Sequence, residues 1–134
     1  MPTYLLDTNH LSPLVTIGHK LREQVLGQIE EGTQFAVCVP VVTEMVVGIS
    51  LLPRALQNRA AWRVLQPLFP CFPLDAADAD VAAELRIDLR KRGWQLETVD
   101  ALIAAVALRH DLILLTRDRD FQAVPQLRTE NWLA

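Results

Sequence analysis

The feature that most constrains the fold is a pair of apolar runs late in the chain. Residues 101–108 carry no polar side chain and are typical of a helix, and the apolar run Leu112–Leu115 follows after the break Arg109-His110-Asp111. A helix without a polar face has to be covered on most sides, and a four-residue apolar strand is typical of the centre of a buried parallel sheet. The pair therefore predicts a sheet whose two faces are both covered.

Further segments alternate between strand and helix patterns in the same way. Strands are expected at 4–6, 35–39 and 112–115, with a weaker one at 72–74 and a short edge strand at 124–128. Helical spacing of apolar residues predicts helices near 11–15, 21–31, 40–49, 54–68, 75–92 and 98–109. Alternation of this kind indicates an α/β fold with a mostly parallel central sheet of four or five strands flanked by helices. We predict one domain over residues 1–134.

Two helices carry specific expectations about their apolar faces. The helix that Pro40 permits to begin should bury Val42, Met45, Val46 and Ile49. In the helix at 54–68, one apolar face is formed at roughly helical spacing by Leu56, Ala60, Val64 and Leu68. The basic run Arg90–Arg92 ahead of Gly93 is typical of a helix end, although it could also face RNA.

Composition narrows the class of protein. A length of 134 residues suits one domain, and 51% apolar with 22% charged residues excludes disorder. Cys38 and Cys71 stand in apolar surroundings and are expected to be lone buried thiols. The net charge of −3 argues against a general nucleic-acid coat. It does not exclude a nuclease, because a metal-binding acid cluster itself adds negative charge.

Two kinds of targeting segment are not recognised in the sequence. The chain runs from Met1 directly into a strand-like segment without the usual basic and apolar regions of a signal peptide. No apolar run reaches the ~20 residues that a membrane-spanning helix needs. We therefore expect a soluble, cytoplasmic protein with no membrane partner.

Acidic residues stand where several of the expected elements begin or end. They are Asp7, Glu44, Asp100 and Asp118. The first and last follow expected strands, and the other two are placed near helix beginnings. Each alone could be only a helix cap, a helix-dipole partner or a loop residue. A parallel α/β topology, however, can bring such boundaries to one edge of the sheet, where ligands bind.

The chemistry of such a cluster favours a metal. Two carboxylates ~4 Å apart repel by about 4 kcal/mol at an effective dielectric near 20, so either raised pKa values or a cation must offset the repulsion. Oxygen ligands without His or Cys suit Mg²⁺, with Mn²⁺ as a substitute, rather than zinc. Such a site can activate water for attack on a phosphodiester. Arg117 and Arg119 could hold neighbouring phosphates, or they could simply be exposed.

Four segments carry a resemblance to a known family. They are Leu5–Asn9, Val42–Gly48, Val99–Ala105 and Leu114–Phe121. In this order they resemble the motifs of PIN-domain ribonucleases, and most closely those of the toxin half of VapC-type toxin–antitoxin pairs. The resemblance spans the whole chain. It implies Mg²⁺-dependent endonucleolytic cleavage of RNA, a homodimer, and inhibition by a small cognate antitoxin.

The resemblance also assigns roles by position. The metal-binding and catalytic acids would be Asp7, Glu44, Asp100 and Asp118. A more variable acidic position falls on Asp120, and polar positions that support the acids fall on Thr8, Asn9 and Thr116. Glu97-Thr98 departs from the family pattern, where relatives often carry glycine or proline and a small polar residue. Whether Glu97 takes part in metal binding is left open.

Three other functions compete with a ribonuclease as explanations of this sequence. A phosphoacceptor signalling domain resembles the pattern, but it uses a lysine after a late strand, and the only lysines here are Lys20 and Lys91. An aspartyl phosphatase would need a second acid in Asp7-Thr8-Asn9. A catalytically inactive PIN-fold binding module stays open as an alternative. His10 is expected to be a polar loop residue without a role, although it could touch the substrate.

Overall fold

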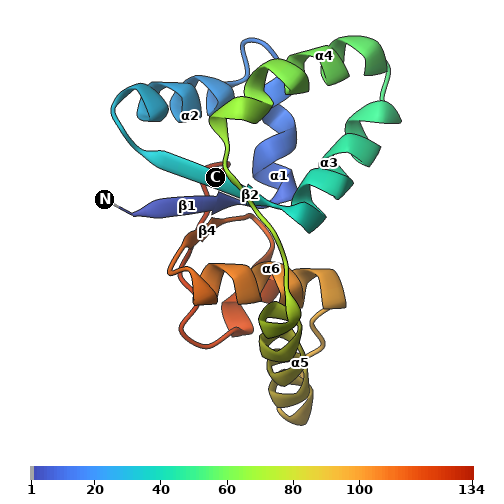
Figure 1. Ribbon diagram of the computed structural model, residues 1–134, viewed down its shortest axis with the longest axis vertical. Coiled ribbons are helices and arrows are strands. Elements are labelled where there is room, and N and C mark those ends of the chain that lie inside the picture. The colour runs from blue at the N-terminus through green and yellow to red at the C-terminus, as the bar shows by residue number, and fades with distance from the viewer. Residues whose placement is uncertain (1) are drawn as a thin grey trace.

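A five-stranded sheet forms the centre of the computed structural model, which describes residues 2–134 (Figure 1). The strands follow the order β3-β2-β1-β4-β5, and each neighbouring pair is parallel. Their bounds are β1 Thr3–Leu6, β2 Gln34–Cys38, β3 Cys71–Phe72, β4 Ile113–Leu115 and β5 Thr129–Glu130. The predicted parallel α/β sheet is thereby confirmed.

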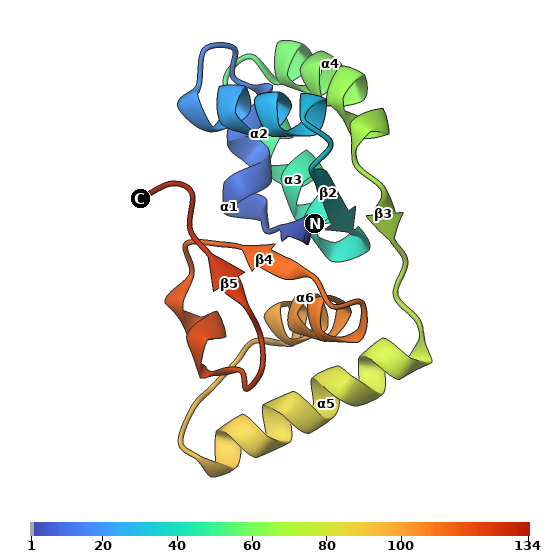
Figure 2. The ribbon, with the colours of Figure 1, turned by 90° about the vertical axis from the view of Figure 1, so that its left-hand side faces the viewer.

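Helices cover both faces of this sheet. Figures 1 and 2 show α1 to α4 on one side and α5 and α6 on the other. The helices on the first side are α1 Thr8–Leu11, α2 Lys20–Glu30, α3 Val39–Ser50 and α4 Ala55–Leu65. Those on the second side are α5 Ala76–Lys91 and α6 Thr98–Arg109. Short 3-10 helices are η1 Ser12–Val15, η2 Gln66–Leu68 and η3 Arg119–Ala123.

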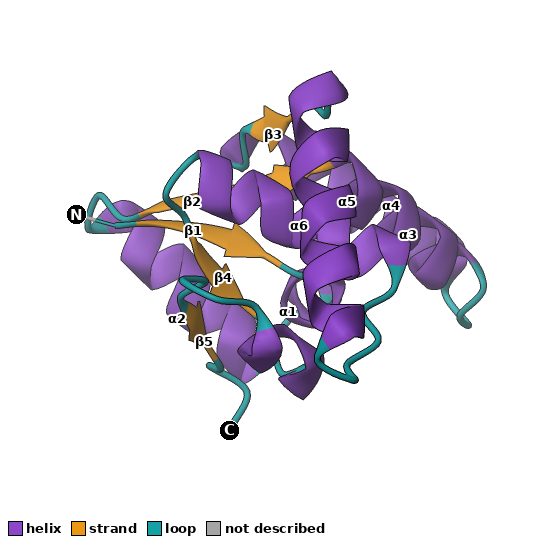
Figure 3. Ribbon diagram, turned by 90° about the horizontal axis from the view of Figure 1, so that it is seen from below, coloured by secondary structure: helices purple, strands orange, loops and turns teal. Residues whose placement is uncertain are grey.

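The apolar helix α6 and the apolar strand β4 form the middle of the molecule. All three residues of β4 are buried, and so are Ala101 and Ile103–Ala107 of α6, which surround the helix axis. Seen from below, α6 and α5 lie in front of the strands (Figure 3). Because α6 lies between the sheet and α5, a helix without a polar face is stable at this position.

The end of β1 fixes the geometry from which the site is built. β1 pairs with β2 on one side and β4 on the other. The backbone N–H of Asp7 continues the second pairing by donating to the carbonyl of Leu115 at 3.0 Å. Residues that follow β1 and β4 therefore start from adjacent points at the carboxyl edge of the sheet, as expected for parallel strands.

The expectation for the helix at 54–68 was only partly right. A helix is present, but Leu56 and Val64 are 85% and 76% exposed, while Trp62 and Leu65 are buried. Helical spacing identified an apolar side of α4 correctly but not its surroundings, because another helix side packs inward. In α3, similarly, Val41 is buried with Met45 and Ile49, whereas Val42 and Val46 are only partly buried.

Two smaller expectations were wrong. The edge strand is not at 124–128 but at β5, and the loop before it contains Gln126 in a left-handed backbone conformation. Cys71 is exposed, because it lies on the short edge strand β3, whereas Cys38 is buried beside it as predicted. None of the helices within residues 2–134 combines the length and the apolar character that a membrane crossing requires.

Candidate active site

Asp7 is the most constrained of the four acids. It follows β1, caps α1 and is only 6% exposed. Its Oδ1 accepts from the Thr8 backbone N–H at 2.8 Å, and its Oδ2 accepts from the Thr116 hydroxyl at 2.7 Å and from the Asn9 amide at 3.2 Å. Burial raises the pKa of Asp7 against these hydrogen bonds, and the charge of Asp118 adds to the rise. The carboxylate is therefore held in one orientation at an electrostatic cost.

The loop after β4 is fastened to the same point. The Thr116 hydroxyl that donates to Asp7 also accepts from the backbone N–H of Asp118 at 3.0 Å. The Asn9 side-chain oxygen accepts from the backbone N–H of Arg117 at 3.2 Å. Two of the three predicted supporting residues, Asn9 and Thr116, thus join the segments that follow β1 and β4. Their placement brings Asp118 to the side of Asp7.

Asp118 and Asp120 differ in their surroundings. Asp118 is partly buried and caps η3, where it accepts from the backbone N–H of Asp120 at 2.9 Å. Asp120 itself is exposed. Arg117 and Arg119 are exposed on the same loop, and neither forms an ion pair within residues 2–134. Both guanidinium groups are accordingly available to an external anion at the rim of the site.

Glu44 reaches the site from α3. It is exposed, and its carboxylate accepts from the Thr8 hydroxyl at 3.3 Å. Its predicted place near the helix beginning was wrong, since the helix already begins at Val39 and has no acid in its first turn. The helix dipole therefore does not account for Glu44. Its contact with Thr8, next to Asp7, is what joins it to the other acids.

Asp100 is the acid whose charge is most strongly opposed by its surroundings. It lies in the first turn of α6 and is partly buried. Burial, followed by the charges of Asp7, Asp118, Glu44 and Asp120, raises the pKa of Asp100 to about 6. The hydrogen bonds agree with this effect, because Thr8 joins Glu44 to the neighbourhood of Asp7 and Thr116 joins Asp118 to it. The four predicted acids, with Asp120 at their edge, thus form one cluster.

The donor chemistry of the cluster fits a hard divalent cation. Its members offer only carboxylate oxygens, supported by hydroxyl and amide groups, which suit Mg²⁺ or Mn²⁺. A dication near Asp100 would offset the repulsion that now opposes its ionisation. Within residues 2–134, no three Asp, Glu, His or Cys side chains already stand at metal-ligand spacing. The exposed Glu44 side chain is freer to rotate than that of Asp7, which accepts three hydrogen bonds.

The prediction for His10 was wrong. It is fully buried in α1, not a loop residue. Its Nδ1 lies 2.6 Å from the side-chain oxygen of Asn9, and its Nε2 accepts from the backbone N–H of Trp132 at 3.1 Å. Burial, with a contribution from the charge of Arg117, lowers the pKa of His10 to about 4. One neutral tautomer, protonated on Nδ1, satisfies both contacts, so His10 holds Asn9 in position.

No sequence signal marked this role of His10. Its partner Trp132 is distant in sequence and packs edge-on against Tyr4 and Phe35, with ring centroids 5.1 and 5.6 Å away. Glu97, left open above, immediately precedes α6; it is exposed, and its side chain makes no capping hydrogen bond. Glu97 thus stands at the N-terminal end of α6, and its part in metal binding stays a question for experiment.

Comparisons with known proteins agree with this architecture. The family model for the PIN domain matches residues 4–127. The chain is 25% identical over 130 residues to the ribonuclease VapC2 of Rickettsia felis, covering 96% of this chain and 97% of that protein. It is 29% identical over 138 residues to the tRNA(fMet)-specific endonuclease VapC of Shigella flexneri, covering 98% and 99%.

Solved structures with the same fold include protein complexes. FitAcB from Neisseria gonorrhoeae matches with a TM-score of 0.78 at 26% identity, over 98% of this chain and 99% of that one. A toxin–antitoxin complex from Klebsiella pneumoniae matches with a TM-score of 0.70 at 25% identity, over 92% and 94%. VapBC2 from Rickettsia felis, bound to a promoter DNA fragment, matches with a TM-score of 0.84 at 24% identity, over 97% and 98%.

Proposed function

The chain belongs to the PIN domain family, and from this premise we propose that it is a metal-dependent endoribonuclease and the toxin of a toxin–antitoxin pair. The observation that carries the proposal is the convergence of Asp7, Glu44 and Asp118 through hydrogen bonds of Thr8 and Thr116 at the carboxyl edge of the sheet. Burial and the charges of these acids raise the pKa of Asp100, and acids gathered in this way mark a candidate functional site. Two relatives that cover nearly the whole chain are named as a ribonuclease and an endonuclease.

Each acid has a distinct part in the proposed mechanism. Asp7, Asp100, Glu44 and Asp118 would hold Mg²⁺. When bound, the metal supplies an activated water and stabilises charge that develops on the phosphate. Asp7 provides a fixed reference point, since three donors hold it. The exposed guanidinium groups of Arg117 and Arg119 would contact phosphates flanking the cleaved bond.

Removal of the metal tests this proposal directly. Purified protein incubated with RNA and Mg²⁺ or Mn²⁺ is expected to produce discrete fragments, and EDTA in excess should stop the reaction. Zn²⁺ should restore it poorly, because the cluster offers only hard oxygen ligands. Mapping of the new RNA ends by primer extension measures the cleavage. RNA that is bound but never cut, with any of these metals, would indicate the inactive binding module instead.

An exposed apolar surface on α3 and α4 supports a protein partner. Large apolar side chains are exposed on this helix pair and on the turn that joins the two helices, and they are Val47, Leu51, Leu52, Leu56 and Val64. Several exposed apolar side chains on adjoining elements are typical of an interaction site. We propose that a small antitoxin covers it, in keeping with the toxin–antitoxin complex among the structural neighbours. We also propose a homodimer, which the same measurement examines.

Substitution of Leu56 tests the partner surface. Leu56→Glu should abolish co-purification with the antitoxin, which we expect to be encoded by the neighbouring gene, because burying a new charge against apolar surface is unfavourable. RNA cleavage should be unchanged. Gln57→Glu is the matched control, since it adds the same charge at the next exposed position of α4. Light scattering after size exclusion measures the masses. Loss of the homodimer in place of the antitoxin complex would assign this surface to a second copy.

A further inference from the structure

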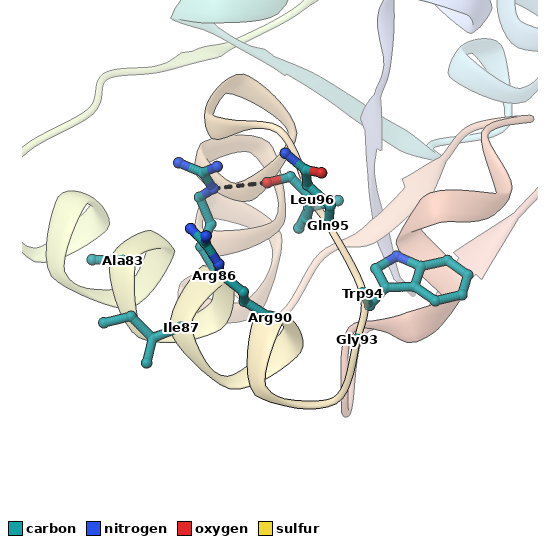
Figure 4. Close-up of a pocket in the computed structure, with 8 residues that line it drawn as sticks. All are labelled: Ala83, Arg86, Ile87, Arg90, Gly93, Trp94, Gln95 and Leu96. Atoms are coloured by element: carbon teal, nitrogen blue, oxygen red, sulfur yellow. Dashed lines mark hydrogen bonds between the residues drawn. The ribbon is translucent and has the colours of Figure 1, made fainter.

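A groove lies beside the start of α6, outside the acid cluster (Figure 4). It has a volume of about 530 Å³ and runs between α5 and the segment 93–96. Side chains of two chemical kinds line it, and they include Arg86, Arg90, Ile87 and Trp94. Guanidinium groups in a groove with an exposed indole beside it are suited to a ligand that is both charged and planar.

Arg86 fixes the wall of this groove to the beginning of α6. Its Nε donates to the carbonyl of Leu96 at 2.8 Å, as Figure 4 shows, and its Nη1 donates to the Thr98 hydroxyl at 2.9 Å. Thr98 is the first residue of α6, and Asp100 is in the first turn of that helix. The groove is therefore held, through one side chain, directly beside the helix end that carries an acid of the proposed site.

Charge is segregated around α5. Arg86 and Arg90 are four residues apart and so lie on one side of the helix. Glu84 and Asp88 lie two positions from them, which is about 200° around a helix and places these acids on the other side. Arg90 is exposed, and neither arginine forms an ion pair within residues 2–134. The groove side of α5 is thus positive in a chain whose net charge is −3.

Trp94 gives this positive surface an aromatic face. Its side chain is among the large apolar groups left exposed, at 41%. Figure 4 shows the indole extending from the segment 93–96 on the side away from the two arginines. A strand that crosses this segment can therefore have a phosphate on the arginine side and a base on the indole side. Stacking on an exposed indole does not depend on which base is present.

We propose that this groove and Trp94 bind a single-stranded stretch of the RNA substrate adjoining the cleaved bond, with phosphates on Arg90 and Arg86 and a base stacked on Trp94. The inference rests on the proposed ribonuclease function and adds to it a binding surface outside the acid cluster. It implies that RNA of several nucleotides binds better than the dinucleotide that contains the cleaved bond. It further implies that an unpaired segment is preferred over a duplex, since a paired base has no free face for Trp94.

Binding of a labelled RNA tests the groove without cleavage. Fluorescence anisotropy with a fluorescein-labelled single-stranded RNA of about 10 nucleotides, in EDTA, measures the Kd. Trp94→Leu should weaken binding about tenfold, while Trp94→Phe, which keeps an aromatic face, should stay within about threefold of wild type. Arg90→Gln should weaken binding about fivefold and lower the slope of log Kd against log salt by about 0.7, the value for one phosphate contact to a single strand.

A distant arginine provides the matched control. Arg63→Gln removes the same charge from an exposed position on α4, at the opposite end of the molecule from α5 (Figure 2), and should leave the Kd unchanged. Equal weakening by Arg63→Gln and Arg90→Gln would show diffuse attraction and overturn the proposal, as would normal RNA binding by Trp94→Leu. Loss of antitoxin binding with normal RNA binding would assign the groove to protein and also overturn it.

The same samples separate this inference from the proposed function. Cleavage by the wild-type protein with Mg²⁺ reports on the acid cluster, whereas the Kd in EDTA reports on the groove. Normal cleavage by the wild-type protein, together with an unchanged Kd in the groove variants, would contradict the groove proposal and leave the nuclease proposal intact. RNA binding that depends on Trp94, in a wild-type protein that never cuts RNA, would contradict the nuclease proposal. The groove would then remain an RNA-binding surface.

Discussion

Replacement of Asp7 by asparagine should reduce RNA cleavage by about three orders of magnitude, equivalent to about 4 kcal/mol of transition-state stabilisation. Asparagine has nearly the same shape but carries no charge and one acceptor oxygen in place of two. The carboxylate of Asp7 accepts from Thr8, Asn9 and Thr116. The variant cannot satisfy all three donors, and it removes the anion from the most rigid position of the site. Single-turnover cleavage of an end-labelled RNA with Mg²⁺ measures the loss.

Asp80→Asn provides the control for this experiment. Asp80 is an exposed acid on α5, and the substitution makes the same chemical change outside the cluster. Its cleavage rate should equal that of the wild type. Circular dichroism must show that Asp7→Asn is folded, because one of its hydrogen-bond donors loses an acceptor. A folded Asp7→Asn protein with wild-type cleavage would remove Asp7 from the proposed mechanism.

Replacement of Asp78 by alanine should destabilise the protein by about 2 kcal/mol, through loss of a helix cap and of one charge-assisted hydrogen bond. Asp78 is fully buried, and it receives the Arg109 guanidinium at 2.7 Å and the backbone N–H of Asp75 at 2.9 Å. The second contact completes a capping box at the start of α5. Alanine therefore removes half of the capping box and one of the two carboxylates that pair with Arg109, which keeps its contact with Asp75 at 3.1 Å. Urea unfolding followed by circular dichroism measures the change, with Asp80→Ala as an exposed control on the same helix.

The contribution of Asp78 should also depend on pH. Burial alone would raise the pKa of Asp78, but hydrogen bonds from Arg109 and Asp75 and the charge of Arg109 outweigh it, so that the pKa is lowered from its ordinary value of 3.8. The folded state therefore binds fewer protons than the unfolded state. The stabilisation is complete above that ordinary value and is lost as the pH falls through the lowered one. Wild type and Asp78→Ala should thus converge in stability at strongly acidic pH; a constant difference would contradict the pKa argument.

Much of the fold followed from local chemistry. The buried runs at 4–6, 35–39 and 112–115 became β1, β2 and β4, within a residue or two at each end. Asp75 caps the beginning of α5, and Gly93 follows its end with a left-handed backbone, in agreement with the helix predicted at 75–92. Such signals depend on neighbours in sequence, which any single chain displays. Leu56 and Val64 were different, because spacing identifies an apolar helix side but not whether anything covers it.

The candidate site was predictable in part for a topological reason. The residues that follow parallel strands lie at one edge of the sheet, so the sequence alone predicts that Asp7 and Asp118 are near each other. The contact between His10 and Trp132 could not, because it joins positions 122 residues apart through a buried ring. The pairing of Asp78 with Arg109, 31 residues apart, is equally invisible in local patterns. The roles of the acids in metal binding and catalysis stay predictions.

The placement of β1 between β2 and β4 has a consequence during synthesis. Asp7 is made early, but the Thr116 hydroxyl that orients it lies 109 residues further along the chain. In a nascent chain whose β4 segment has not yet left the ribosome, Thr116 and Asp118 are missing from the site. The strand β4, one of the two neighbours of β1, is missing from the sheet. The proposed nuclease would therefore be silent while the ribosome that makes it is still engaged. On the proposed function, each copy would be unable to cut RNA until its own chain has left the ribosome.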